Sequence, residues 1–541
     1  MMAQTKGKKE VVAEYDVFDG LNFRQLLEKT ANAYPDKEAL VYKDKRVSYR
    51  EFNENVDKLA TEFQRIGIQK EDCCAVLLPN SLEATYVQYA ILKLGAIFIG
   101  LSTRYRKFEL TYMLKHSEAK ALVSVDEFMG TNFLDLLEEI KAELPHLNTF
   151  VVQGKNVPPN VYSLEGLFAK HTKPAILHAD QVDENAIASI LYTSGSTGRP
   201  KGITSTHRNI IWNAIRVCER LSIAEPDSFL MMLPLSHVFA SLVLLTHAIM
   251  LGCKTVIMDV FEPEEALRLI EEEKISILYG VPTMFVMMLN HPNFKKYDLS
   301  SLRTGYLSGA TCPPDLVRSI IDDMGCSISQ AYGMAETCCM CVSEYGDTPD
   351  IKAETCGYPL RDVEVRVVDE EGKECPVGQV GEFVVRGDNV TRGYYKAPEL
   401  NREAFDEEGW FHSGDLGLED DNGRYRFVGR KKEMITRGGF HLFPVEIEEV
   451  ICQFPSVQFA AVVGLPDKIM TEISCACVMP KPGQEIEVEA LKTYLKANLA
   501  RNKLPDRIEV FSDLPMTTTN KILKYQLVED LILQGRPIDK K

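Results

Sequence analysis

The chain has 541 residues, of which 45% are hydrophobic and 26% charged, and its formal net charge is −17. This composition indicates a globular protein with a sizeable core and excludes a disordered chain, a collagen and a coiled coil. At roughly 150 residues per domain, the length predicts between two and four domains. The acidic charge would repel phosphate backbones, so we expect no nucleic-acid partner.

Fourteen cysteines are scattered through the chain, and the cluster Cys338, Cys339 and Cys341 lacks the paired C-x-x-C spacing of a zinc site. We interpret them as free thiols in a reducing compartment. Residues 1–16 contain lysines but no apolar stretch behind them, so they do not form a secretory signal. The apolar segment at 239–252 contains polar residues and is too short to span a bilayer. We therefore expect a cytoplasmic protein without a transmembrane segment.

In the first half of the chain, short apolar runs alternate with helical patterns of hydrophobic residues. This alternation predicts βαβ crossovers and a parallel sheet covered on both faces. The expected elements are a strand at 73–78, a helix at 82–94, strands at 96–101 and 121–125, a strand at 255–258, a helix at 263–273 and a strand at 275–278.

From Val363 onward the sequence favours antiparallel strands joined by Gly and Pro turns. After the charged stretch 430–433 it changes again, to a compact α+β pattern of helices at 445–452 and 487–500 and strands at 459–464 and 473–479. The predicted fold class is α/β: a large N-terminal region of layered sheets at 1–430 that includes a β-rich subdomain at about 355–430, and a small mobile α+β domain at 431–541.

The most distinctive local motif is Y-T-S-G-S-T-G-R-P-K-G at residues 192–202, between an apolar run and the helical pattern at 209–221. Its N–H and O–H groups can converge on phosphate oxygens, and Lys201 adds a positive charge for the same anion. The spacing is not that of a Walker A loop. An ordinary Ser/Gly turn is the alternative, which the added Pro-Lys-Gly disfavours. The candidate nucleotide-binding residues here are Thr193, Ser194, Gly195, Ser196, Thr197, Gly198 and Lys201.

This loop resembles the signature of the adenylate-forming superfamily, which includes acyl-CoA synthetases, luciferases and the adenylation domains of peptide synthetases. Further resembling segments follow in order along nearly the whole chain. They are V-S-Y-R-E-F at 47–52, L-K-L-G-A at 92–96, Y-G-M-A-E at 332–336, G-E at 381–382, S-G-D at 413–415, G-R-K-K at 429–432, G-G at 438–439 and the stretch 515–521. Each segment alone is a weak signal, whereas their order in one chain is specific.

The Y-G-M-A-E motif contains residues suited to a nucleotide and its metal. Glu336 is a hard oxygen ligand for Mg²⁺, Tyr332 offers a flat face for adenine, and Gly333 permits close approach of a ligand. The family usually has Thr where this chain has Ala335, so one hydroxyl contact is missing. Without the other motifs, Glu336 would be interpreted as a solvated surface acid. The nucleotide-binding set implied by the resemblance also contains Gly309, Ala310, Ala331, Asp415 and Arg430.

Charged residues of the second half complete the nucleotide-binding and catalytic sets that the resemblance implies. Asp415 follows a tight Ser-Gly turn, and the family uses the matching Asp to accept the ribose hydroxyls, with Arg430 reinforcing that edge. Lys521 ends a stretch similar to the family's catalytic-lysine motif, with Asn520 where Gly is common. Its ammonium would stabilise charge that accumulates in the transition state at the α-phosphate. The implied catalytic residues are Lys521, Lys201 and Glu336.

The resemblance also implies a domain rotation about Lys432, after which the small domain presents a second face to the same site. Gly438 and Gly439 would lie on that face and leave room for the pantetheine arm of CoA. Thr436 stands where many relatives have Lys, and the Arg-Gly-Gly that follows resembles aryl-acid-activating relatives. The acceptor of the second step is therefore either CoA or a carrier protein.

The pocket for the acid is expected around the segment S-H-V-F-A at 236–240. Amino-acid-activating relatives have Asp after the aromatic residue, whereas Ala240 follows Phe239 here, so an apolar acid is favoured over an amino acid. A packed core residue is the alternative reading of His237. The expected pocket residues are His237, Val238, Phe239, Gly309, Ala310, Gly333 and Met334.

These observations predict an ATP-dependent acyl-CoA synthetase that forms an acyl-adenylate with release of pyrophosphate and then transfers the acyl group to CoA. Its expected cofactors and co-substrates are ATP, Mg²⁺ and CoA, and its partner is a small carboxylic acid, fatty or aryl. The alternatives are a stand-alone ligase that loads an acyl carrier protein, a non-catalytic nucleotide sensor and, more remotely, a luciferase-like oxidation. The sequence leaves the chain length of the acid and the oligomeric state open.

Overall fold

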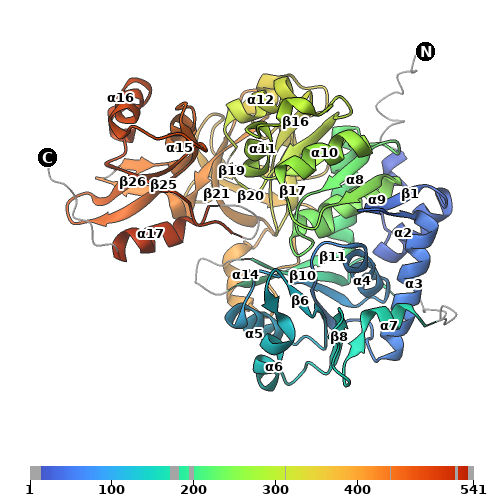
Figure 1. Ribbon diagram of the computed structural model, residues 1–541. Coiled ribbons are helices and arrows are strands. Elements are labelled where there is room, and N and C mark those ends of the chain that lie inside the picture. Colours follow the sequence, from blue (N-terminus) through green and yellow to red (C-terminus); the bar gives the residue numbers. More distant parts are fainter. Residues whose placement is uncertain are drawn as a thin grey trace, which may run out of the picture.

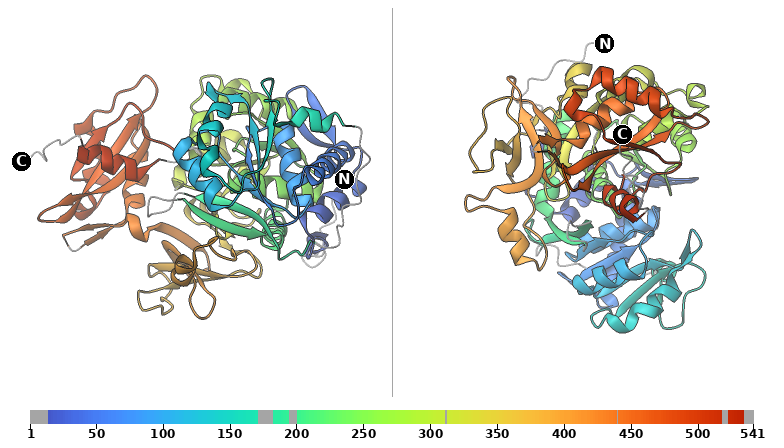
Figure 2. Two further views of the ribbon diagram at one scale, coloured as in Figure 1. Left: turned by 90° about the horizontal axis from the view of Figure 1, so that it is seen from below. Right: turned by 90° about the vertical axis from the view of Figure 1, so that its left-hand side faces the viewer.

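The computed structural model describes residues 14–170, 182–193, 200–310, 312–438, 440–517 and 522–533. Figures 1 and 2 show the C-terminal elements at one end of the molecule, away from the N-terminal helices α2 (Phe23–Ala33) and α3 (Tyr49–Arg65). Sheets covered by helices fill the rest of the molecule. This arrangement confirms the predicted α/β class with a separate C-terminal α+β region.

The first large sheet has the strand order β11-β10-β4-β3-β5-β8-β9 and is parallel except where β10 and β11 form an antiparallel pair. The strands β3 and β5 are buried along their whole length, as their apolar runs predict. The strands are β3 (Cys73–Leu77), β4 (Ile97–Gly100), β5 (Ala121–Val125), β8 (Thr149–Gln153), β9 (Tyr162–Ser163), β10 (Ile187–Thr193) and β11 (Lys201–Thr206). Around them lie α4 (Leu82–Lys93), α5 (Lys107–His116), α6 (Phe133–Ile140), η1 (Lys141–Glu143), α7 (Leu164–Phe168) and the small hairpin β6 (Glu127–Phe128) and β7 (Thr131–Asn132).

The second large sheet has the order β18-β17-β16-β15-β14-β12-β13-β1-β2, with parallel pairing from β16 through β1. Its strands are β1 (Glu38–Tyr42), β2 (Lys45–Ser48), β12 (Ser228–Met231), β13 (Lys254–Ile257), β14 (Ile277–Gly280), β15 (Thr304–Leu307), β16 (Ser327–Met334), β17 (Cys338–Val342) and β18 (Tyr358–Pro359). The associated helices are α8 (His207–Leu221), the π-helix η3 (Phe239–Leu244), α9 (Leu245–Leu251), α10 (Pro263–Glu273), α11 (Pro282–Leu289), η4 (Phe294–Lys296), α12 (Pro314–Met324) and α13 (Pro349–Glu354). One continuous buried core joins the two large sheets.

The motif at 47–52 has a local physical explanation in this fold. Ser48 caps α3 in a capping box: its side chain accepts from the N–H of Glu51, and the Glu51 side chain accepts from the N–H of Ser48. Tyr49 is fully buried and its hydroxyl donates to the carbonyl of Cys253 at 2.6 Å. The motif therefore starts a helix and anchors it to the second sheet.

The β-rich region is an antiparallel sheet of order β19-β20-β21-β22, as the sequence predicts. Its elements are β19 (Glu364–Val368), β20 (Gly381–Arg386), α14 (Pro398–Ala404), β21 (Phe411–Glu419) and β22 (Tyr425–Arg430). The 3-10 turn η5 (Lys431–Glu433) follows β22 directly and leads into the C-terminal region.

The C-terminal sheet has the order β24-β23-β26-β25, with β27 paired to β26, and is packed by its own hydrophobic clusters. Its elements are β23 (Ile435–Arg437), β24 (Phe440–Leu442), α15 (Pro444–Cys452), β25 (Val457–Asp467), β26 (Thr471–Pro480), α16 (Val488–Asn498), η6 (Arg501–Lys503), β27 (Arg507–Val510) and α17 (Lys524–Leu533). The predicted helices and strands of this region are all present, with bounds shifted by one to three residues.

Four features of the fold bear on the sequence predictions. β11 was not predicted, because K-G-I-T-S-T has no apolar run, and it lies between the glycine-rich loop and α8. The strand expected at 275–278 begins two residues later, as β14. The apolar segment at 239–252 is the buried π-helix η3 and helix α9, and within the described ranges no helix is long and apolar enough to cross a membrane. All fourteen cysteines lie in the described part of the chain, and none forms a disulfide.

Candidate active site

The strands on either side of the glycine-rich motif, β10 and β11, pair with each other in antiparallel fashion. Thr193, the last residue of β10, pairs with Lys201, the first residue of β11. The predicted residues Ser194, Gly195, Ser196, Thr197 and Gly198 lie outside the described residues. The structure therefore brings the two ends of the loop together at one end of the first large sheet.

A tyrosine that sequence reasoning missed joins Lys201 to Glu336. The Lys201 ammonium lies 5.1 Å from the ring centroid of Tyr394, and the Tyr394 hydroxyl donates to Glu336 Oε1 at 3.0 Å. The loop that carries Tyr394 is held against β11, because the N–H of Tyr395 donates to the carbonyl of Gly202 at 2.7 Å. The only sequence signal was an aromatic pair after a glycine, which carries no periodicity.

Glu336 is recessed, in contrast to the surface acid of the alternative interpretation. Burial raises its pKa, against the opposing effects of Tyr394 and the positive Lys201. The hydroxyl of Thr337 does not replace the one missing at Ala335: it is buried, accepts from the N–H of Met334 at 3.3 Å and donates to the carbonyl of Cys338. Glu336 therefore offers a carboxylate to the site without a neighbouring side-chain hydroxyl from its own motif.

The donor set around Glu336 fits Mg²⁺ that is carried by a nucleotide. Among the described residues, no group of three or more His, Cys, Asp or Glu side chains is arranged to hold a metal ion. Mg²⁺ commonly takes one or two protein carboxylates and obtains its other ligands from substrate phosphates and water. One recessed carboxylate near a lysine matches this pattern. It does not match a metal site in which the protein supplies all the ligands.

The second cluster of the site contains Tyr332, Asp415 and Arg430. The Tyr332 hydroxyl donates to Asp415 Oδ2 at 2.8 Å, and Arg430 Nε lies 3.5 Å from Asp415 Oδ1. Asp415 and Arg430 face each other because they are register partners on β21 and β22. Burial raises the pKa of Asp415 to about 6, although the positive Arg430 opposes this effect. The sequence predicted that these residues share a site, and the structure brings them together.

The surroundings of β16 give Tyr332 and Gly333 specific roles in packing. One face of the Tyr332 ring stacks on Phe427, with centroids 5.7 Å apart and planes at 24°. A Cβ at Gly333 would lie 1.9 Å from the carbonyl oxygen of Cys338 on β17. The close approach for which Gly333 is needed is thus made by the neighbouring strand. Ala331, two residues before, is buried on the same strand β16.

An aromatic wall surrounds Phe239 at the predicted acid pocket. Phe239 stacks against Tyr306 and Tyr279, with centroid distances of 5.1 and 5.7 Å. Tyr279 and Tyr306 are register partners on β14 and β15, and Nδ1 of the buried His247 lies 2.9 Å from the Tyr279 hydroxyl. Sequence reasoning missed both tyrosines, because each is one apolar residue in a buried run.

The other predicted pocket residues lie on neighbouring segments. His237 Nδ1 accepts from the N–H of Phe239 at 3.2 Å, so this histidine organises the start of η3. Gly309 has a positive φ of 88°, and Ala310 beside it is exposed. The rest are Val238 at the N-cap of η3, and Gly333 and Met334 at the end of β16.

The predicted hinge residue Lys432 lies in η5, between the antiparallel sheet and the C-terminal sheet. Desolvation lowers its pKa, and the positive charges of Arg430 and Lys201 act in the same direction. Gly438, with φ of 57°, donates its N–H to the carbonyl of Met470 at 2.8 Å. Gly439 and Lys521 lie outside the described residues.

Described residues beside Lys521 show which part of the large region this segment contacts. Met516 and Ile522 form an antiparallel bridge across it. Arg104 Nη1, in the loop after β4, donates to the carbonyl of Thr517 at 3.4 Å. Thr517 therefore contacts the loop that follows β4 of the first large sheet.

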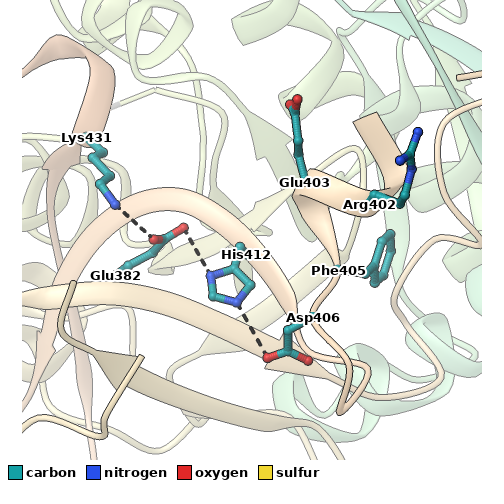
Figure 3. A pocket seen from close by; sticks show the side chains of 7 residues that line it. All are labelled: Glu382, Arg402, Glu403, Phe405, Asp406, His412 and Lys431. Carbon is teal, nitrogen blue, oxygen red and sulfur yellow. Dashed lines mark hydrogen bonds and ion pairs between the residues drawn. The ribbon is translucent and has the colours of Figure 1, made fainter. Parts of the chain in front are cut away.

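A charged cavity of about 380 Å³ borders the Asp415 strand and the hinge segment (Figure 3). In it, His412 lies between two carboxylates, with Nδ1 3.7 Å from Glu382 Oε1 and Nε2 3.5 Å from Asp406 Oδ2. The cavity is separate from the residues predicted for the acid. Its lining residues are Glu382, Arg402, Glu403, Phe405, Asp406, His412 and Lys431.

Comparison with known families identifies the class of enzyme to which this fold belongs. The model of the AMP-binding enzyme family matches residues 27–395, and that of the AMP-binding enzyme C-terminal domain matches residues 446–521. The chain belongs to this family, which confirms the resemblance to adenylate-forming enzymes.

Individual relatives cover nearly the whole chain. The chain is 36% identical over 531 residues to YngI of Bacillus subtilis strain 168, covering 94% of this chain and 96% of YngI. It is 33% identical over 537 residues to the human mitochondrial medium-chain acyl-CoA ligase ACSF2, covering 94% and 87% of the two chains. Among solved structures, the anthranilate CoA ligase AuaEII in complex with anthranoyl-AMP has a TM-score of 0.89 at 28% identity, covering 95% of this chain and 98% of that one.

Proposed function

We propose that this protein is an ATP-dependent acyl-CoA synthetase that activates an apolar carboxylic acid as its acyl-adenylate and transfers the acyl group to the thiol of CoA. The observation that carries the proposal is the pair of clusters around Glu336 and Asp415. One combines a carboxylate with a lysine through Tyr394, and the other combines a buried carboxylate with an arginine. A nucleotide needs both: cation-supported phosphate binding and an acceptor for the ribose hydroxyls.

In the first half-reaction, a carboxylate oxygen of the acid attacks the α-phosphorus of ATP, and the bond to the bridging oxygen of pyrophosphate breaks. Lys201 and the loop before it bind phosphate oxygens, and Asp415 accepts from the ribose hydroxyls, so the acid and the α-phosphate are held in line. Mg²⁺ held by Glu336 would neutralise phosphate charge. Lys521 contributes its ammonium at the α-phosphate, by resemblance to the family's catalytic lysine.

In the second half-reaction, the CoA thiol loses its proton and attacks the acyl carbonyl, and the bond to AMP breaks. AMP is a much better leaving group than hydroxide, so two easier displacements replace a difficult one. The small domain rotates about Lys432 between the steps and brings the turn at Gly438 and Gly439 to the site. This rotation separates the two chemical steps in time.

The aromatic wall around Phe239 supports an apolar acid. Phe239, Tyr279 and Tyr306 are buried against each other, and the Tyr279 hydroxyl has a partner in His247. No charged residue belongs to the predicted acid pocket, so an ammonium group on the acid would have no partner there. Because a relative is named a medium-chain acyl-CoA ligase, we propose medium-chain fatty acids as the first class and aryl acids, suggested by the anthranilate CoA ligase structure, as the second.

Fourteen cysteines without a disulfide support a reducing compartment such as the cytoplasm.

One screen tests the proposal. Pyrophosphate release is measured with ATP and Mg²⁺ over short, medium, long and aromatic acids, and CoA consumption is then followed with the best acid and no carrier protein present. We expect acid-dependent pyrophosphate release and saturable CoA consumption. Pyrophosphate release without CoA consumption would favour the carrier-protein ligase, and no acid-dependent release would favour the nucleotide sensor.

A further inference from the structure

The segment around Lys432 carries a charge on each neighbour of the predicted hinge residue, and these charges have partners in different parts of the fold. Lys431 Nζ lies 3.4 Å from Glu382 Oε2 on β20. Glu433 Oε2 lies 3.2 Å from Lys524 Nζ, the first residue of α17. The residue before the hinge is thus paired to the antiparallel sheet, and the residue after it to the C-terminal region.

Both partners are themselves fixed. Glu382, which Figure 3 shows beside Lys431, is 14% exposed. It also accepts from the N–H of Gly414 at 3.0 Å, within the turn that precedes Asp415. Lys524 is 22% exposed and also pairs with Glu448 on α15 at 2.8 Å. Because each partner has a second bond within its own region, each pair holds the hinge segment to a rigid element.

A further ion pair crosses the hinge residue. Arg430 Nη1 lies 3.8 Å from Glu433 Oε1, and the same guanidinium lies 3.5 Å from Asp415. This distance of 3.8 Å is longer than those of the pairs Arg430–Asp415, Lys431–Glu382 and Glu433–Lys524. A rotation about Lys432 would break it and leave Lys431–Glu382 and Glu433–Lys524 intact.

We propose that Glu382 and Lys524 are positioning residues that confine the domain rotation to Lys432, by clamping Lys431 to the antiparallel sheet and Glu433 to the C-terminal region. This inference rests on the proposed function, because it specifies how the rotation between the two half-reactions is localised. It gives a role to the Gly381-Glu382 motif and to the charged side chains of Lys431 and Glu433, which the chemistry itself does not use.

The test compares the effect of locking Lys432 in chains with and without the clamps. Lys432→Pro fixes φ at the hinge. In the otherwise unchanged chain we expect overall turnover to fall about 100-fold, because the second arrangement of the domains is misplaced. In the Glu382→Gln, Glu433→Gln background, neighbouring residues can take up the rotation, and Lys432→Pro should cost about tenfold or less relative to that background.

The clamp substitutions are chosen to keep the fold. The amide at Glu382→Gln still accepts from the N–H of Gly414, and Glu433→Gln leaves Lys524 paired with Glu448. Lys524→Met is the second variant on that side, with Lys524→Arg as the conservative rescue. Glu446→Gln is the matched control: it removes an ion pair of the C-terminal region, with Lys503, that involves neither Lys524 nor the hinge segment, so Lys432→Pro should still cost about 100-fold in that background.

The outcomes distinguish a failure of the clamp proposal from a failure of the proposed function. An equal cost of Lys432→Pro in all backgrounds, or no cost in the unchanged chain, overturns the clamp proposal. Acid-dependent pyrophosphate release by the unchanged chain is measured alongside, and its absence would overturn the proposed function instead. A reduced cost in the Glu382→Gln, Glu433→Gln background but not in the Glu446→Gln background supports the proposal.

Discussion

We predict that the ionised carboxylate of Asp415 lowers the free energy of unfolding. The substitution Asp415→Asn tests this prediction. The asparagine keeps an oxygen that accepts from the Tyr332 hydroxyl but removes the buried charge. Burial raises the pKa of Asp415 from 3.8 to about 6, a value in which the attraction of Arg430 is already included. A carboxylate that is harder to ionise in the folded chain than in the unfolded chain lowers stability wherever it is charged.

The pH dependence of this cost follows from the two pKa values. Below pH 3.8 the carboxyl group is protonated in both the folded and the unfolded chain, and Asp415 does not change the stability. Between pH 3.8 and about 6 the unfolded chain loses its proton first, so the stability falls. Above about pH 6 both states are ionised and the loss of stability is complete. At about 1.36 kcal/mol per pH unit, the cost is about 3 kcal/mol at pH 8 and about 1.6 kcal/mol at pH 5. Asp415→Asn should therefore be the more stable chain, by these amounts.

Denaturant unfolding at both pH values measures the change, with Asp420→Asn, in the turn that joins β21 to β22, as the matched control. Although partial burial opposes it, the N–H groups of Arg424 and Asn422 lower the pKa of Asp420. Its charge therefore stabilises the folded chain above pH 3.8, so Asp420→Asn should destabilise at pH 8. Equal stability of Asp415→Asn and the unchanged chain at pH 8, or a gain that does not shrink at pH 5, would refute the reasoning.

The same substitution should weaken nucleotide use, because a neutral amide is a poorer acceptor for ribose hydroxyls. Losing a charged hydrogen bond of about 1.5–3 kcal/mol corresponds to a rise in KM for ATP of about 10- to 100-fold. Gained stability with lost activity is the expected signature of a residue kept for binding. An unchanged KM for ATP would mean that the ribose lies elsewhere.

Three further substitutions test the remaining roles. Lys521→Ala should abolish acyl-adenylate formation and leave acyl transfer from supplied acyl-adenylate to CoA largely intact; equal loss of both half-reactions contradicts the assigned role. Glu336→Gln should raise the Mg²⁺ concentration needed for half-maximal pyrophosphate release by about tenfold or more, and an unchanged Mg²⁺ titration would remove Glu336 as a ligand. Phe239→Ala should shift the preferred acid toward bulkier chains with KM for ATP unchanged, as read from initial rates over an acid series; an unaltered preference would place the pocket elsewhere.

The elements that the sequence predicted are those in which burial and periodicity agree. Every residue of β3 and β5 is buried, so their apolar runs were sufficient, and α10 begins at Pro263, a residue suited to the first helical turn. β11 lacks such a run and depends on pairing with β10 and on contacts of Gly393 and Tyr395 with its backbone. Contacts between residues so distant in the chain leave no local pattern to recognise.

The candidate active site likewise contains residues that the sequence predicted and residues that it did not. Motif order predicted that Asp415, Arg430 and Tyr332 belong together, and their hydrogen bond and ion pair agree. Tyr394 was missed because its position depends on a loop folding back on β11, and the tyrosines of the acid wall were missed because strand register aligns them. A resemblance identifies residues that a family shares, whereas such supporting side chains appear only when the fold is known.

The charged stretch 430–433 contains the predicted hinge residue Lys432, which the resemblance indicates and the composition does not. Its composition indicates a solvated linker, yet Arg430, Lys431 and Glu433 each have a partner of opposite charge. A linker with unpaired charges would bend at any of its residues. Pairing the two neighbours of Lys432 to different regions leaves rotation about that residue as the motion that keeps both pairs. The pair that crosses Lys432, Arg430–Glu433, is also the longest of these ion pairs at 3.8 Å, and it is the one that the rotation breaks.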